Sequence, residues 1–208
     1  MKQPSPILLV AAAEFELAAL RDSLQKSLRE DIDYAMVGIG AIHAAKNAER
    51  VAEKARGRKV IFVGTAGIFG KFSTVKLMCA RQVLWMPACE RANIAYSIPG
   101  LHPPIDLPAP PSWVADLELA TVVCGPTISK TALLSTELPE KLQQPVVENL
   151  ELYSCIAEIM ASAQETVILL GITNAIGPDA HQQWKKNHPL AAKLTAEYCV
   201  SHMKESRP

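Results

Sequence analysis

The sequence predicts an α/β fold, a single-domain three-layer sandwich in which helices flank a mostly parallel, twisted central sheet. Short apolar, β-branched runs of strand length alternate with longer segments whose apolar residues recur at helical spacing. The chain of 208 residues suits one domain with a full core, and we expect that domain to cover residues 1–208. Hydrophobic residues make up 49% and charged residues 20% of the chain, values typical of globular proteins, which excludes wholesale disorder.

The first third of the chain alternates between strands and helices. An apolar run at residues 7–12 leads into a helix over about residues 15–28, whose leucines mark one buried face. A short strand at residues 34–37 is followed by a glycine turn and an alanine-rich helix over about residues 42–55. Residues 60–63 are a third strand, ended by glycine. Three strands separated by two helices in so short a span favour a parallel, doubly wound sheet.

The middle of the chain is less regular. Residues 75–85 read as one long strand, because β-branched and apolar residues interleave with polar ones. Six of the fifteen prolines then fall between residues 99 and 111, a density that excludes helix interiors and regular ladders. We therefore interpret residues 93–111 as a proline-rich surface excursion, a long loop, with a lid or a partner contact as alternatives.

The last part is predicted to continue the same sheet. Its expected strands cover residues 119–124, 145–147 and 167–170. Its expected helices cover about residues 130–138 (capped by Ser129), 152–163 and 190–202.

Composition narrows the classes of partner. Lys plus Arg and Asp plus Glu both total 21, and no basic block occurs, so we expect no nucleic-acid partner. No apolar stretch is long enough to span a membrane, and the first apolar run is too short for a signal peptide. The five scattered cysteines lack metal-ligand spacing with the histidines, which favours buried reduced thiols in a cytoplasmic protein and no metal. A small molecule or another protein chain remains as partner.

Polar residues stand where the predicted strands end. They are Glu14, Glu16, Thr65, Glu151 and Asn174. Each has a simple structural explanation alone; Asn174, in the glycine-flanked segment 171–177, suits a turn. Parallel strands, however, bring their carboxyl ends to one edge of a sheet, where ligands bind. Their coincidence at that edge predicts a functional site.

Five motifs containing these residues follow one another along the chain. They are residues 9–16, Gly38-Ile39-Gly40 with its alanine-rich helix, residues 64–67, residues 148–151, and Thr173-Asn174. In order and spacing they resemble the motifs of the purine nucleoside phosphorylase/nucleosidase superfamily, over residues 7 to about 200. Within that superfamily, residues 12–16, 147–151 and 173–178 followed by Trp184 are most similar to futalosine hydrolase.

The resemblance implies a role for each matching position. Glu16 would be the catalytic carboxylate that activates water, and Asn174 the catalytic partner of purine N7. Glu151 would bind the ribose 2′- and 3′-hydroxyls. The remaining implied substrate-binding residues are Thr65, Ala66, Gly67, Ile128, Asn149, Leu150 and Thr173. The resemblance also implies a homodimer that needs no cofactor. Of the histidines, only His181 is a candidate to line the pocket.

Two features bear on the reaction and the base. An asparagine amide cannot donate a proton, but it can donate N–H to the O6 of a 6-oxopurine while accepting from N7–H, so Asn174 favours hypoxanthine as leaving group. Phosphorylases of the superfamily carry a glycine-rich turn with an arginine after the first strand, whereas residues 11–16 here hold neither. Two carboxylates there would repel phosphate, which favours water as nucleophile.

The sequence therefore predicts a nucleosidase that hydrolyses futalosine to hypoxanthine and dehypoxanthine futalosine, a step of menaquinone biosynthesis. One alternative is a methylthioadenosine/adenosylhomocysteine or aminodeoxyfutalosine nucleosidase. The other is a catalytically degenerate nucleoside-binding protein, because Leu152 and Tyr153 stand where the superfamily has small residues that leave room for the sugar.

Overall fold

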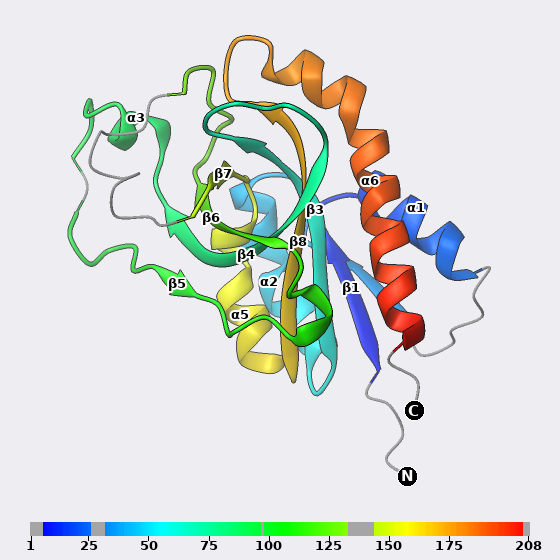
Figure 1. Cartoon of the computed structure of the whole chain (residues 1–208). Helices are drawn as coiled ribbons and strands as arrows, with labels where there is room; N and C mark the ends of the chain where they lie inside the picture. Colours follow the sequence, from blue (N-terminus) through cyan, green and yellow to red (C-terminus); the bar gives the residue numbers. More distant parts are fainter. Residues whose placement is uncertain (1–5, 26–31, 97, 133–143, 206–208) are drawn as a thin grey trace.

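A mixed β-sheet that closes on itself forms the centre of the protein (Figure 1). The computed structural model describes residues 6–25, 32–96, 98–132 and 144–205. Its strands are β1 (Ile7–Ala11), β2 (Ile32–Met36), β3 (Lys59–Ile68), β4 (Lys76–Trp85), β5 (Ile105–Asp106), β6 (Glu118–Cys124), β7 (Val146–Glu148) and β8 (Glu165–Ala175).

The strand pairing bears out only part of the expectation of a mostly parallel, twisted sheet, because the sheet is mixed and closes on itself. β2, β1, β3 and β8 lie side by side and parallel, as predicted. β8, however, pairs antiparallel with β4, and β7 pairs antiparallel with β3. Because β4 also pairs with β6, and β6 with β7, these five strands form a closed ring. The protein is thus an α/β fold whose parallel half continues into a small barrel.

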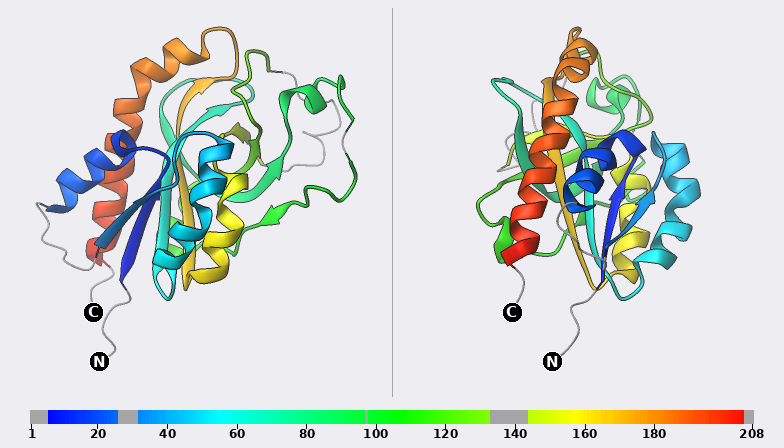
Figure 2. Two further views of the ribbon diagram at one scale, coloured as in Figure 1. Left: turned by 180° about the vertical axis from the view of Figure 1, so that it is seen from behind. Right: turned by 90° about the vertical axis from the view of Figure 1, so that its right-hand side faces the viewer.

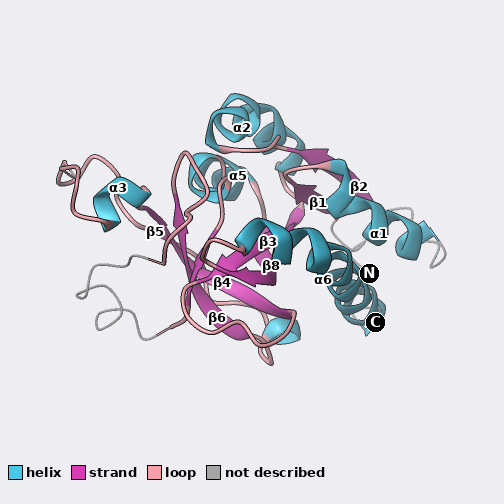
Figure 3. Cartoon of the chain, turned by 90° about the horizontal axis from the view of Figure 1, so that it is seen from above, coloured by secondary structure: helices cyan, strands magenta, loops and turns pink. Residues whose placement is uncertain are grey.

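Helices cover both faces of the parallel half (Figures 2 and 3). The helices are α1 (Glu14–Gln25), α2 (Ala41–Ala55), α3 (Ala88–Arg91), α5 (Ile156–Ser162) and α6 (Ala180–Glu205), with 3-10 turns at Ser112–Val114 and Leu152–Ser154. α1 packs against α6, and α2 packs against α5. The two predicted helical layers are therefore present.

Strand β1 shows why both faces are covered. Leu8 and Val10 belong to the core cluster that includes α2 and α5 residues, whereas Leu9 belongs to the cluster that includes α1 and α6 residues. Successive side chains of a strand point to opposite faces, so a strand that is apolar throughout needs a layer on each side.

Two strands extend well beyond their predicted ends. Glycines predicted that the third strand stops at residue 63 and the last at residue 170, yet β3 and β8 stay paired to Ile68 and Ala175. Asn174 therefore lies in a strand rather than in the expected turn. The register shifts by one residue between Ala66 and Gly67, so Thr173 is an unpaired bulge residue.

The other differences concern helices and the proline-rich segment. α6 begins at Ala180, ten residues before the predicted start, and contains Pro189. Pro189 is exposed, so water can bind the carbonyl that its missing N–H leaves free. The predicted helix 152–163 is a 3-10 turn followed by α5, and most of the predicted helix 130–138 lies outside the described residues. Within the excursion 93–111, β5 forms a short antiparallel pair with β4, despite the prolines.

Two statements about composition can be compared with the structure. Four cysteines are buried free thiols, and Cys89 is exposed. Among the described residues, no helix is both long and apolar enough to cross a membrane.

We expect Gly171→Ala to destabilise the protein by about 1–3 kcal/mol, because overpacking a tight contact displaces its neighbours. A Cβ atom at Gly171, on β8, would lie 2.7 Å from Cβ of Ala191 on α6. Urea unfolding measures this. Gly177→Ala is the matched control, since nothing lies within 4 Å of its added Cβ. Equal stability of the two variants would contradict the close approach of α6 to β8.

Candidate active site

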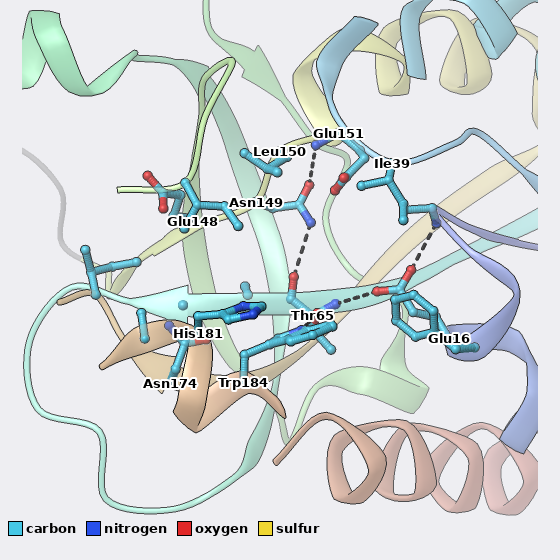
Figure 4. A pocket seen from close by; sticks show the side chains of 17 residues that line it. Glu16, Ile39, Thr65, Glu148, Asn149, Leu150, Glu151, Asn174, His181 and Trp184 are labelled. Carbon is cyan, nitrogen blue, oxygen red and sulfur yellow. Dashed lines mark hydrogen bonds between the residues drawn. The ribbon is translucent and has the colours of Figure 1, made fainter. Parts of the chain in front are cut away.

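A cavity of about 260 Å³ opens between β3, the turn after β7, the end of β8 and the start of α6 (Figure 4). Nine of the ten predicted site residues line it: Glu16, Thr65, Ala66, Gly67, Ile128, Asn149, Leu150, Glu151 and Asn174. The tenth, Thr173, is fully buried behind the wall. The structure therefore brings the predicted motifs together around one cavity.

Glu16 is a buried carboxylate held by backbone amides. α1 begins directly after β1, and the Glu16 side chain turns back so that Oε2 accepts from the N–H groups of Ala12 (3.1 Å) and Ala13 (3.3 Å). Oε1 accepts from the N–H of Thr65 on β3, at 3.1 Å. Burial, assisted by the negative charge of Glu151 and opposed by the amide hydrogen bonds, raises the pKa of Glu16 to about 7. Such a group exchanges a proton readily at neutral pH.

Glu151 faces the same cavity from the opposite wall. Its Oε1 accepts from the N–H of Gly40 at 2.8 Å, and burial raises its pKa above the usual range. Gly40 has a φ of 83°, in the left-handed region that favours glycine, and it precedes α2 directly. The glycine turn thus delivers a backbone donor to the carboxylate.

Asn149 braces the turn that carries Glu151. Its Oδ1 accepts from the N–H groups of Glu151 (2.9 Å) and Leu152 (3.0 Å), as in an Asx turn. Its Nδ2 donates to the carbonyl of Thr65 at 3.2 Å. Asn149 therefore ties this turn to β3, a role that the sequence did not reveal.

The bulge at Thr173 orients Asn174. The Thr173 hydroxyl lies 2.8 Å from Oδ1 of Asn174 and 3.3 Å from the carbonyl of Ala66. Nδ2 of Asn174 donates to the carbonyl of Ala175 at 3.0 Å. A Cβ atom at Gly67 would lie 2.7 Å from Nδ2 of Asn174, so only glycine leaves room for the amide. The amide retains one N–H and one lone pair for a ligand.

An aromatic cluster at the start of α6 forms another wall. Trp184 donates its indole N–H to Oγ1 of Thr65 at 3.2 Å. Its ring stacks on His181 (centroids 5.8 Å apart) and on His188 (4.7 Å), and Phe15 meets it edge-on. Trp184 and Phe15 were not predicted to line the cavity, because Pro189 masked the first turns of α6 and Phe15 lacked any distinguishing pattern.

A buried ion pair lies beside the cavity. Nη2 of Arg91 donates to Oε1 of Glu148 at 2.8 Å and also to Oγ of Ser129. Glu148 accepts in addition from the hydroxyl (2.5 Å) and the N–H (2.9 Å) of Ser129. Glu148 lines the cavity, yet the sequence assigned none of these three residues to the site. The pairing is long-range, and a single sequence contains no signal for it.

The bulky residues after Glu151 do not crowd the cavity. Leu152 is fully buried in the core. Tyr153 points to the proline-rich segment, where its hydroxyl donates to the carbonyl of Pro103 at 3.0 Å and its ring packs on Trp85 and His102. Neither lines the cavity. The described residues also hold no cluster of three or more His, Cys, Asp or Glu side chains suited to a metal ion.

Comparisons with known proteins find similarity in structure rather than in sequence. No protein-family model and no curated protein matches the sequence. The structure is similar to 5′-methylthioadenosine/S-adenosylhomocysteine nucleosidase of Helicobacter pylori, a mutant with 5′-methylthioadenosine in its active site (TM-score 0.76, 16% identity, 98% of this chain and 100% of that chain). It is also similar to a futalosine hydrolase mutant of the same species (TM-score 0.75, 16% identity, 97% and 99%).

A third similar structure is S-adenosylhomocysteine nucleosidase of Streptococcus pyogenes in complex with 5-methylthiotubericidin (TM-score 0.73, 13% identity, 100% and 99%). The protein has the nucleosidase fold. Because these identities lie between 13 and 16%, the similarity establishes the fold alone.

We expect the charge of Glu16 to destabilise the protein above neutral pH. Its ordinary pKa of 4.5 applies to the unfolded chain and about 7 to the folded one, so the folded state holds the proton longer. Stability should therefore fall as pH rises from 4.5 through 7, by about 3 kcal/mol in total. Glu16→Gln should remove the part of the pH dependence that Glu16 contributes and leave the part due to the raised pKa of Glu151.

Urea unfolding between pH 4.5 and 8 measures the difference. The matched control is Glu14→Gln, which removes an exposed neighbour paired with Arg21. Identical pH profiles for wild type and Glu16→Gln would show that Glu16 is not buried as described.

Proposed function

We propose that the protein is a purine nucleosidase that hydrolyses the N-glycosidic bond of a 6-oxopurine nucleoside, most specifically futalosine, with release of hypoxanthine. The observation that carries this proposal is the buried Glu16, whose pKa of about 7 is suited to a general base, in one cavity with Glu151 and Asn174. The nucleosidase fold makes such a reaction a natural use of the cavity.

Glu16 and Glu151, the two carboxylates whose pKa values are raised, suit separate parts of the reaction. Cleavage of a glycosidic bond passes through an oxocarbenium-like state, which a nearby anion stabilises. Glu16 accepts a proton from the attacking water, and its three amide hydrogen bonds fix its position. Glu151, held by Gly40, accepts hydrogen bonds from the ribose 2′- and 3′-hydroxyls and orients the sugar.

Asn174 acts on the leaving base. Negative charge grows on the purine as the bond breaks, and the remaining N–H of the Asn174 amide stabilises it at O6. As N7 takes up a proton from solvent water, the amide oxygen accepts the hydrogen bond from N7–H. The Thr173 hydroxyl and Gly67 hold the amide in place. These contacts strengthen toward the transition state, which is the condition for catalysis.

Water is the proposed nucleophile because the cavity lacks a phosphate site. No lysine or arginine lines it among the described residues, whereas three glutamates do. These carboxylates would repel a phosphate anion, whereas they do not repel a neutral water molecule.

A 6-aminopurine nucleoside is the alternative substrate. The similar Helicobacter pylori nucleosidase holds 5′-methylthioadenosine, and this similarity in fold favours an adenine-releasing reaction. Asn174 opposes it, because an amide cannot protonate adenine N7. Cytoplasmic location, a homodimer of single-domain chains and a place in menaquinone biosynthesis belong to the same proposal; the buried free thiols support the first of these.

Release of free base from futalosine, followed by chromatography, tests the proposal. We expect Glu16→Gln to lower kcat at least a hundredfold while nucleoside binding persists, and wild-type kcat/KM to rise with pH through about 7 as Glu16 loses its proton. Glu14→Gln should retain activity. Hypoxanthine release by Glu16→Gln at the wild-type rate would exclude Glu16 as the base.

Asn174→Asp tests the choice of base. A protonated aspartic acid could donate to adenine N7, so we expect the rate of adenine release from methylthioadenosine, relative to hypoxanthine release from futalosine, to rise at least tenfold. Asn93→Asp, at an exposed position outside the cavity, is the control. A wild-type protein that releases adenine and no hypoxanthine would refute the 6-oxopurine assignment.

A further inference from the structure

Glu148 is a third carboxylate in the cavity, and the proposed reaction gives it no task. Its Oε1 accepts from Arg91 (2.8 Å) and from the hydroxyl of Ser129 (2.5 Å), whereas Oε2 accepts from the N–H of Ser129 (2.9 Å). Each carboxylate oxygen has about two acceptor positions. Oε2 therefore keeps one that no described residue fills.

Stability alone explains this ion pair poorly. The side chains of Arg91 and Glu148 are 1% and 5% exposed, and buried pairs of this kind often stabilise a fold no better than apolar residues do. Nε of Arg91 is buried and has no hydrogen-bond partner among the described residues, which adds a further cost. What the pair does provide is a carboxylate fixed in position at the cavity wall.

The position of Glu148 relates it to the base. In Figure 4, Glu148 and Asn174 lie toward one end of the cavity, and Glu16 lies toward the other. In the proposed function, Glu16 and Glu151 bind water and sugar, so the purine extends toward Asn174 and Glu148. Ile128, the neighbour of Ser129, lines the cavity too.

We propose that Glu148 determines the choice of base by accepting the N1–H of a 6-oxopurine through Oε2. This inference rests on the proposed function and extends it from the imidazole side of the purine, near Asn174, to the pyrimidine side. A 6-oxopurine carries a hydrogen on N1, whereas adenine has a lone pair there. A carboxylate held by Arg91 and Ser129 accepts a hydrogen bond from the N1–H of a 6-oxopurine and repels the N1 lone pair of adenine. A buried polar group that finds no partner on the wrong base gives strong discrimination between the two bases.

The test compares futalosine with aminodeoxyfutalosine, which differ at purine C6. We expect Glu148→Gln to lower the ratio of their kcat/KM values at least tenfold, because glutamine can donate an N–H to adenine N1. Glu118→Gln is the matched control: it removes a surface ion pair with Lys76 away from the cavity and leaves the ratio unchanged. A purely structural role for Glu148 would lower both values together.

A second variant protects the test from loss of folding. Glu148→Gln leaves the buried charge of Arg91 without a partner. The double variant Arg91→Met, Glu148→Gln should therefore be more stable than Glu148→Gln alone, while its ratio of kcat/KM values for the two substrates stays lowered. An unchanged ratio in whichever of these variants folds would overturn the role of Glu148.

Direct binding separates this inference from the proposed function. Calorimetry should show that the wild type binds hypoxanthine at least tenfold more tightly than adenine, and that Glu148→Gln narrows the difference at least threefold. If the wild type releases no base from either nucleoside, the proposed function fails, and these binding data still decide the role of Glu148. Equal affinity for the two bases, or binding of neither, would refute it.

Discussion

The parallel pairing of β3 with β8 sets the relative positions of nearly all polar groups in the cavity. β3 supplies Thr65, whose N–H holds Glu16, whose carbonyl binds Asn149 and whose hydroxyl receives the indole N–H of Trp184. β8 supplies Asn174 beside Gly67. The bulge at Thr173 changes the alternation of β8 just before Asn174 and so decides which face its amide occupies. A change in this register would disturb every proposed step at once.

The three cavity carboxylates illustrate how surroundings assign different chemistry to one residue type. Glu16 receives only neutral amide donors, so burial prevails and its pKa rises to about 7. Glu151 receives one amide from Gly40, and burial raises its pKa as well. Glu148 instead receives a guanidinium and a serine, which fix its direction. A proton acceptor, a sugar ligand and a rigid hydrogen-bond acceptor thus differ by their partners rather than by their own structure.

Local patterns in the sequence predicted most elements, and nine of the ten residues that they assigned to the site line the cavity, because strand ends and motifs are local properties. The failures have physical causes. Glycines at residues 64 and 171 resembled strand ends but lie inside β3 and β8, and Gly171 allows the close approach of α6 to β8. Pro189 hid a helix that tolerates it at an exposed position. Ring closure by β4 and β7, and the Arg91–Glu148 pair, join distant segments and have no local signature. Thr173 was adjacent to the site but acts from behind it.

The closed strand ring also has a consequence for how the chain is made. β3 ends at residue 68, but its long-range partner β8 begins only at residue 165, so the pairing joins segments far apart in the sequence. Such topologies fold slowly, since the chain loses the entropy of loop closure before the long-range contacts that stabilise it have formed. A nascent chain would expose the unpaired backbone edge and the apolar side chains of β3 until β8 leaves the ribosome, a period in which unpaired strands aggregate or need chaperones. Because Asn174 belongs to β8 and Trp184 to α6, an N-terminal fragment that ends before β8 lacks part of the cavity wall, and nucleoside binding requires synthesis to pass these residues.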